Sequence, residues 1–392
     1  MKKKVLFLIH TLQVGGAEKI LVNLVNNMDK SKYDITVMTV INTGAFIKEL
    51  GSDINYKTIF NFPFLNRKNK KESSGNLLNK TSKMKKVLAN LYKFMWRHIN
   101  CKRLYSKFIK EDYDVEIAFL EGISAKIIAN STNSKSKKIC WIHVDLINER
   151  KTERFFKRNE EKMIYEKFEK IVAVSKHVKE QFIKKYNYDA NKVIVKYNPI
   201  DEKYIELQSN EELLDIKKNK FTLCTIGRLS IQKGYDRLLR VVNRLNKSKL
   251  KFDLWIIGVG DEEDKLKQYI KENDLKNVNL LGYKKNPYKY IKNSDLFVCS
   301  SRAEGFSTVV SEAIILEKPI VTTECSGMRE LLGEKEEYGI ICKNEEEDLF
   351  NSLFDILSNK ERYKYYKEKI VERKQMFNIN NAVRSIEELL EE

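Results

Sequence analysis

The chain has 392 residues, enough for two or three domains of ordinary size, and 42% of them are hydrophobic, which excludes wholesale disorder. The 4 Pro and 15 Gly exclude collagen-like and proline-rich architectures, and no apolar run approaches the roughly 18 residues of a membrane-spanning helix. The formal net charge is +18, and the six cysteines include no C-x-x-C pair, so we expect buried thiols in a reducing cytoplasm rather than a zinc or redox site.

Short apolar runs alternate with longer helical patterns along the whole chain. This alternation favours parallel sheets with crossover helices, and two sets of about six strands predict two doubly wound α/β domains. The strands predicted in the first half are Val5–Ile9, Ile35–Val40, Val115–Leu120, Lys138–Ile142, Ile171–Val174 and Val193–Val195. Those predicted in the second half are Phe221–Ile226, Phe252–Ile257, Val278–Leu281, Leu296–Cys299, Pro319–Thr322 and Ile340–Cys342.

Most of the positive charge lies in one basic segment, residues 66–110, which has fourteen Lys or Arg and one acid. Its second part predicts a helix, with apolar residues from Met84 to Met95 at helical spacing. Three interpretations compete: a solvated basic face, contact with an anionic membrane surface or lipid head group, and nucleic-acid binding. No nucleic-acid motif accompanies the charge, so the last is disfavoured. The candidate membrane-surface cations are Lys83, Lys85, Lys86, Lys93 and Arg97.

A break near Pro199 separates the two sets of strands. Pro199 interrupts local structure, and a polar stretch follows it as far as Lys220. We therefore expect one Rossmann-like domain over residues 1–198, which includes the basic segment, and a second over residues 199–375. The remaining residues, 376–392, predict an amphipathic helix that returns to the N-terminal domain.

Open parallel sheets bind ligands beyond the carboxyl ends of their strands, and two motifs there could bind an anion. Gly15 and Gly16 form a strand-to-helix turn that lets the backbone approach a bulky anion, although a purely structural turn is an alternative. The turn lacks the G-x-G-x-x-G pattern, which disfavours a nicotinamide cofactor. Arg228 and Lys233 follow the strand at 221–226, where two cations can neutralise a diphosphate without a metal, unless they are a solvated pair.

The third motif runs from Glu304 to Glu312 and follows the strand at 296–299. Gly305 permits a tight turn into an apolar helix, whose first N–H groups, near Phe306, Ser307 and Thr308, would form an anion site. Glu304 precedes the helix and Glu312 lies about one turn inside it, so one carboxylate can reach sugar hydroxyls and the other a ribose. The alternative is a helix with an N-terminal acid and a surface acid.

Together these residues resemble a known family. The spacing of Glu304 and Glu312 is similar to the E-x7-E element of retaining nucleotide-sugar glycosyltransferases of family 4, which have the GT-B fold. The resemblance covers nearly the whole chain and is loosest from about 62 to 110. It implies two doubly wound Rossmann-like domains facing an interdomain cleft, with the acceptor side in the N-terminal domain and the donor in the C-terminal one. Further matches are at 15–18, 171–175, 198–201, 227–234, 256–261, 281–283 and 326–327.

The resemblance also implies roles for single residues. Arg228 and Lys233 would bind the donor diphosphate, Glu304 would lie near the transferred sugar, and Glu312 would bind the ribose. The backbone of Phe306 to Thr308 and of Gly16 would approach phosphate, and Tyr283 lies in a segment that lines the base pocket. His143, at the end of the strand at 138–142, resembles a histidine that family members place beside the reacting sugar, and Glu121 is an acceptor-side candidate.

The expected reaction is transfer of a sugar from a nucleoside diphosphate sugar to an acceptor hydroxyl with retention, by front-face attack assisted by the leaving phosphate. Uridine is the expected base, followed by guanosine. No cofactor or metal is expected, since the D-x-D at Asp112–Asp114 precedes a strand, the wrong end of a parallel sheet for a ligand. The basic segment favours a membrane-held, polyprenyl-diphosphate-linked saccharide acceptor in bacterial surface polysaccharide synthesis, on the inner face of the cell membrane. A nucleotide-sugar epimerase and a non-catalytic nucleotide-sugar-binding subunit remain alternatives.

Overall fold

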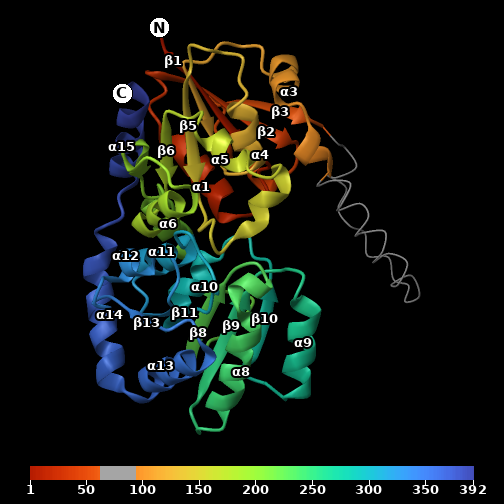
Figure 1. Cartoon of the computed structure of the whole chain (residues 1–392). Coiled ribbons are helices and arrows are strands. Elements are labelled where there is room, and N and C mark those ends of the chain that lie inside the picture. The colour runs from red at the N-terminus through yellow and green to blue at the C-terminus, as the bar shows by residue number, and fades with distance from the viewer. Residues whose placement is uncertain (62–93) are drawn as a thin grey trace. The chain divides into compact units, whose positions relative to one another are not determined.

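The computed structural model describes residues 1–61 and 94–392, and the chain divides into two compact units (Figure 1). Unit 1 comprises Met1–Val174, Val178–Tyr197 and Ala382–Glu392, and unit 2 comprises Ser175–His177 and Asn198–Asn381. Four of the candidate membrane-surface cations, Lys83, Lys85, Lys86 and Lys93, lie outside the described residues. No helix within the two described ranges is both long and apolar enough to cross a bilayer.

Unit 1 is built on a parallel sheet of seven strands in the order β3-β2-β1-β4-β5-β6-β7. Its central strands are continuous apolar runs because both faces of a parallel sheet are buried. The strands are β1 (Lys3–Ile9), β2 (Tyr33–Ile41), β3 (Asn55–Phe60), β4 (Val115–Ala118), β5 (Lys137–Ile142), β6 (Lys170–Ala173) and β7 (Val193–Val195). The helices are α1 (Gly16–Asn27), α3 (Cys101–Phe108), α4 (Ile123–Ile128), α5 (Glu160–Tyr165), α6 (Lys176–Tyr186) and α15 (Ile379–Glu391), with 3-10 turns η1 (Ala45–Glu49), η3 (Arg150–Phe155) and η4 (Ala190–Lys192).

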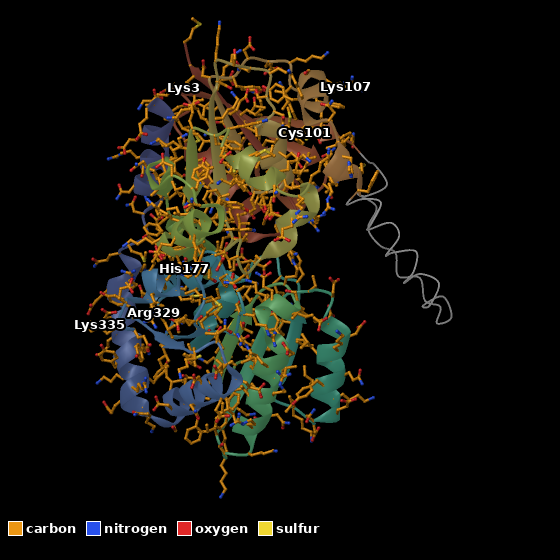
Figure 2. All side chains as sticks on the ribbon, viewed as in Figure 1. Lys3, Cys101, Lys107, His177, Arg329 and Lys335 are labelled. Carbon is orange, nitrogen blue, oxygen red and sulfur yellow. The ribbon has the colours of Figure 1, made fainter. Side chains whose placement is uncertain are left out.

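The last helix, α15, packs on unit 1 at the amino ends of its strands. Its apolar stripe is buried, including Leu389 and Leu390. Lys3, labelled in Figure 2, donates from Nζ to the Leu390 carbonyl at 2.9 Å and pairs with Glu391 at 2.7 Å. The Lys137 ammonium donates to the Leu389 carbonyl at 2.7 Å. These cations satisfy carbonyls that a helix C-terminus leaves without intrahelical partners.

Unit 2 is built on a second parallel sheet, of six strands in the order β10-β9-β8-β11-β12-β13. One group of helices, which includes α8, α9 and α13, covers one face, and α8 and α9 lie alongside β8 to β10 (Figure 1). The strands are β8 (Phe221–Ile226), β9 (Phe252–Ile257), β10 (Val278–Gly282), β11 (Leu296–Cys299), β12 (Ile320–Thr323) and β13 (Ile340–Cys342). The helices are α7 (Glu202–Ser209), α8 (Tyr235–Asn246), α9 (Glu263–Glu272), α10 (Tyr288–Asn293), α11 (Thr308–Ile315), α12 (Met328–Leu332), α13 (Glu346–Ser358) and α14 (Lys360–Lys374), with a 3-10 turn η5 (Ile231–Lys233).

The structure confirms the α/β class and all twelve predicted strands to within two residues at each end. It adds one strand that the sequence patterns did not predict, β3. That strand lies at the edge of the sheet, and its Asn55 is exposed, so it lacks the apolar run that marks a central strand.

Candidate functional site

The strand order of unit 2 reverses between β8 and β11, and ligands of open α/β sheets bind at such a switch point. The loops that follow these two strands carry both the cation motif and Glu304. The structure therefore brings together two motifs that lie about seventy residues apart in the sequence.

The central contact of this site is an ion pair between the two loops. Lys233 Nζ lies 2.6 Å from Glu304 Oε1, and the Ser301 hydroxyl donates to the same oxygen at 2.5 Å. The lysine and glutamate side chains are 22% and 10% exposed, so the pair is largely shielded from water. Burial alone would lower the pKa of Lys233, but the Glu304 carboxylate outweighs it, and the pKa is raised. Lys233 is therefore fully charged at neutral pH.

The two loops approach each other closely because Gly234 lies between them. Its φ is +68°, and a Cβ there would be 2.1 Å from the carbonyl oxygen of Ser300. The Ser300 hydroxyl donates to the Lys233 carbonyl at 2.9 Å, and the Arg302 amide donates to the Gln232 carbonyl at 2.7 Å. Only glycine combines this backbone conformation with this contact.

The second predicted cation, Arg228, differs from Lys233. Its side chain is exposed, and no hydrogen bond or ion pair ties it to another of the described residues. It directly follows Gly227, against which the Lys233 stem packs, since a Cβ at Gly227 would lie 3.4 Å from Lys233 Cδ. Lys233 is thus held by Glu304, whereas the side chain of Arg228 is available to bind an external anion.

The start of α11 supplies polar groups beside this pair. Ser307 is the N-cap of the helix, but its side chain caps nothing, and its Oγ is buried with no hydrogen-bond partner among the described residues. Phe306 is buried, and Thr308 begins the helix. Ser175, which belongs to unit 2, donates from Oγ to the Gly305 carbonyl at 3.3 Å. A buried N-cap hydroxyl with no partner, at a helix N-terminus, is suited to an anion.

Glu312 and Tyr283, the two residues expected to bind the nucleoside, lie on other parts of unit 2. Glu312 is half-buried one turn inside α11, on the element that the sequence predicted. Tyr283 directly follows β10 and is 51% exposed. It stands beyond a strand at the edge of the same sheet, next to Gly282, where a Cβ would meet nothing within 4 Å.

In unit 1 the corresponding switch lies between β1 and β4. Gly15 is the N-cap of α1 in an extended conformation, and Gly16 begins the helix. A Cβ at Gly15 would lie 2.2 Å from Oε2 of Glu18, so the glycine makes room for a carboxylate at the helix N-terminus.

Glu121 and His143 follow β4 and β5 and contact each other. The His143 amide donates to Glu121 Oε2 at 3.0 Å. Burial raises the pKa of Glu121 to about 7, and burial lowers the pKa of His143 to about 4. Nε2 of His143 is buried without a partner in the described part of the chain. The lowered pKa keeps the ring neutral near pH 7, and an unprotonated Nε2 would be a hydrogen-bond acceptor for a ligand hydroxyl.

Sequence reasoning missed two residues of these edges. His10, at the end of β1, lies edge-on to the rings of Trp96 and Phe155, and burial lowers its pKa to about 4. Its position directly after the first strand was the available signal. Ser301 was missed because its hydrogen bond to Glu304 forms within the loop after β11, and no sequence pattern predicts that contact. Of the membrane-surface candidates, Arg97 is described: it is exposed, and it donates to the Glu153 carbonyl at 3.4 Å.

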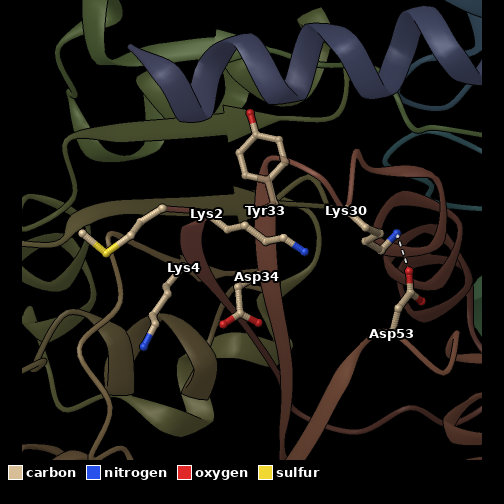
Figure 3. Close-up of a pocket in the computed structure, with 7 residues that line it drawn as sticks. Lys2, Lys4, Lys30, Tyr33, Asp34 and Asp53 are labelled. Atoms are coloured by element: carbon tan, nitrogen blue, oxygen red, sulfur yellow. Dashed lines mark ion pairs between the residues drawn. The ribbon is translucent and has the colours of Figure 1, made fainter.

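A hollow of about 400 Å³ lies at the amino ends of β1 and β2, opposite the functional loops of that sheet (Figure 3). Lys30 pairs there with Asp53 at 3.6 Å. At the same end, Asp114 Oδ2 accepts the Lys4 amide at 2.7 Å, which gives the D-x-D a structural contact. The described residues contain no group of three or more His, Cys, Asp or Glu placed to hold a metal ion.

Two family models match the chain: Glycosyltransferase Family 4 over residues 14–204 and Glycosyl transferases group 1 over residues 208–373. A Campylobacter jejuni N-acetylgalactosaminyltransferase that acts on a diphospho-undecaprenol-linked saccharide is 34% identical over 55% of this chain and 58% of its own length. An uncharacterized Haemophilus influenzae glycosyltransferase is 25% identical over 93% of this chain and 92% of its own. The chain thus spans little more than half of the first of these curated relatives.

Solved structures share the fold of the whole chain. Anabaena HepE in complex with UDP and glucose has a TM-score of 0.73 at 19% identity, and covers 99% of both chains. Staphylococcus aureus TarM, solved with UDP, has a TM-score of 0.71 at 14% identity and covers 100% of both chains. Since two family models span residues 14–373 and both sheets have the doubly wound order, the chain belongs to the family 4-type glycosyltransferases and has the GT-B fold.

Proposed function

We propose that the protein transfers a sugar from a nucleoside diphosphate sugar to a saccharide acceptor in bacterial surface polysaccharide synthesis. One observation carries the proposal: the loops at the switch point of unit 2 hold an ion-paired lysine, an arginine with no partner among the described residues, and a helix start whose N-cap hydroxyl makes no hydrogen bond to them. Relatives named for amylovoran and capsular polysaccharide synthesis support the pathway.

The chemistry follows from the charges. Departure of a nucleoside diphosphate builds negative charge on the terminal phosphate. Arg228, Lys233 and the N-terminus of α11 would stabilise this charge with fixed dipoles and cations in a partly dry site. Such preorganised electrostatic stabilisation is usually the largest single contribution to catalysis. Three such groups suffice without a metal ion, so we infer a metal-independent reaction. We propose front-face attack assisted by the leaving phosphate, which retains the anomeric configuration, as the resemblance to retaining family 4 enzymes implies.

The donor is proposed to be a uridine nucleotide sugar, with guanosine as the second choice. Two structures of the same fold hold UDP, which supports this order. The exposed Tyr283 ring beyond β10 is a stacking surface for the base, and the half-buried Glu312 is a partner for the ribose.

The acceptor is proposed to be a lipid-diphosphate-linked saccharide, as the name of the Campylobacter relative describes for that enzyme. Nε2 of His143 would accept a sugar hydroxyl, and Glu121 would bind the acceptor side. We further propose that the basic segment attaches the protein to the anionic inner face of the cell membrane. A flotation assay with anionic vesicles tests this last point. Binding that is unchanged when Lys83, Lys85, Lys86, Lys93 and Arg97 are neutralised would contradict it.

The proposed function is tested by thermal-shift screening against a panel of nucleotide sugars, followed by product analysis with the stabilising donor. Ligands that bind the folded state raise its melting temperature by mass action. We expect stabilisation by one class of nucleoside diphosphate sugar, and sugar transfer when a lipid-linked acceptor is added. Isomerised donor without any acceptor would instead reveal an epimerase. Binding without turnover, even with membranes supplied, would reveal a non-catalytic subunit.

A further inference from the structure

We propose that Arg237, a residue of α8, is a positioning residue for the donor diphosphate site. Its guanidinium lies beneath the loop that carries Glu304 and fixes that loop against β12 and β13. The inference rests on the proposed function, because it assigns Arg237 a role in binding the terminal phosphate of a nucleoside diphosphate.

Arg237 is 4% exposed, and its guanidinium makes five hydrogen bonds. Nη2 donates to the carbonyls of Ser300 and Ser301 at 2.6 and 2.7 Å, and Nε donates to Ser300 at 3.0 Å. Nη1 donates to the Asn344 carbonyl at 3.2 Å, and Nη2 also meets Thr323 Oγ1 at 3.2 Å. One side chain thus joins the end of β12 to the loops that follow β11 and β13. A guanidinium is suited to this role because its donors form a rigid planar fork.

No carboxylate among the described residues forms an ion pair or a hydrogen bond with Arg237. The neighbouring Asp236 is occupied on the other side, by Arg302 at 2.7 and 2.8 Å and by Arg240 at 3.3 Å. A buried cation is costly unless it is compensated, and neutral carbonyls compensate it here only in part. The remaining positive charge favours an anion bound above the loop.

The link from Arg237 to the donor site is short. Ser301 presents its carbonyl to Arg237 and to Thr323 Oγ1, which donates to it at 2.5 Å, and its hydroxyl donates to Glu304 at 2.5 Å. Glu304 in turn holds Lys233. Displacement of Ser301 would therefore release the carboxylate that orients Lys233. Arg237 acts through Ser301 and Glu304, and does not need to touch the nucleotide itself.

The test is the ratio of affinities for a nucleoside diphosphate and its monophosphate, measured by titration calorimetry with UDP against UMP and with GDP against GMP. Global destabilisation would not change this ratio in the folded fraction, whereas misplacement of Lys233 weakens only the diphosphate. We expect R237K, which keeps the charge but loses the fork, to bind diphosphate about 10-fold more weakly, on the scale of one charge-assisted hydrogen bond. Monophosphate affinity should stay at the wild-type value.

A second pair of variants covers the case in which changes at Arg237 prevent folding. T323V removes the hydroxyl that binds Ser301 but keeps the branched shape, and T323S keeps the hydroxyl. We expect T323V to lower the ratio of diphosphate affinity to monophosphate affinity. T323S should keep most of the wild-type ratio. R244M, which removes an arginine of the same helix that pairs with Glu347 and does not touch Asp236 or Arg302, is the matched control and should leave the ratio unchanged.

Two outcomes would overturn the inference. If R237K or T323V is folded and retains the wild-type ratio, the buried arginine is purely structural. If the wild type binds no nucleoside diphosphate more tightly than the monophosphate, the proposed donor site fails, and this inference fails with it.

Discussion

Replacement of the two predicted phosphate-binding cations should have different effects on stability but the same effect on turnover. Arg228 is exposed and has no partner among the described residues, whereas Lys233 is held by Glu304 at 2.6 Å. R228A therefore removes a group that only an external anion can use. K233A removes a phosphate-binding cation and also leaves the Glu304 carboxylate, which is 10% exposed, without its ion-pair partner.

The magnitudes follow from these environments. A surface substitution changes the free energy of unfolding by less than about 0.5 kcal/mol, so R228A should keep the wild-type melting temperature. A polar group left unsatisfied in a buried site costs about 1–3 kcal/mol, which corresponds to a decrease in melting temperature of roughly 2–12 °C for a domain of this size. Each variant should lose about 10²-fold or more in turnover, as expected when one preorganised electrostatic donor is removed.

The assay combines thermal denaturation with steady-state kinetics on the donor identified by screening. The double variant K233A/E304Q separates the two effects, since a neutral amide relieves the stranded charge: its melting temperature should recover, but its turnover should not. K267A, which breaks an exposed ion pair on α9, is the control. Near-normal turnover in both R228A and K233A would refute the assignment of these cations to the donor phosphates. A K233A protein as stable as wild type would refute the account of the ion pair.

Three further predictions concern single residues. The pKa of Glu121 is raised to about 7, so the stability that its protonated form contributes is present below about pH 4.5 and lost as the pH rises through 7. The free energy of unfolding in urea should fall more between pH 5 and pH 8 for wild type than for E121Q, and equal slopes would contradict this. Burial lowers the pKa of His143 to about 4, so its ring signal in NMR, assigned by its absence in H143Q, should not titrate near pH 6.5; H143Q keeps an acceptor near Nε2 and should retain more turnover than H143A. G234A must place a Cβ 2.1 Å from the Ser300 carbonyl, whereas Gly282, with a similar φ of +69°, faces open space. G282A should therefore lose about 1 kcal/mol for its backbone conformation alone and G234A clearly more, as measured by urea denaturation.

Most of the fold could be predicted from the sequence because strands and helices alternate regularly along the chain. Central parallel strands are buried on both faces, so they stand out as apolar runs such as Val5–Ile9, between helical patterns. The edge strand β3 was missed because exposure at the edge admits Asn55 and Lys57. The helix α1 begins at Gly16, four residues before the apolar pattern starts at Ile20, since a first turn exposed to solvent carries no periodic signal.

Residues of the candidate site were predictable one loop at a time, but their contacts were not. Arg228, Lys233 and Glu304 follow strands whose ends were predicted correctly, so each could be placed at the carboxyl edge of a sheet. The Lys233–Glu304 pair spans 71 residues and exists because β8 and β11 are neighbours in the sheet. That neighbourhood depends on strand order, which local patterns do not encode. The role of Arg237 could not be predicted for the same reason: an arginine in a helix predicts exposure, and its burial depends on contacts with residues that follow β11 and β13 and with the end of β12.

The charges at the two switch points support the proposed division of the two substrates between the units. In unit 2, the three cations Arg228, Lys233 and Arg237 outnumber the two carboxylates Glu304 and Glu312, so the edge is suited to a diphosphate. In unit 1, burial keeps His143 neutral and leaves Glu121 partly protonated near pH 7, so that pair offers hydrogen bonds with little fixed charge. A diphosphate needs positive charge and would gain little from these nearly neutral groups. Sugar hydroxyls are uncharged, so they can hydrogen-bond to them without the cost of desolvating a charge. The proposed division of donor phosphate to unit 2 and sugar hydroxyls to unit 1 therefore follows from electrostatics within each unit.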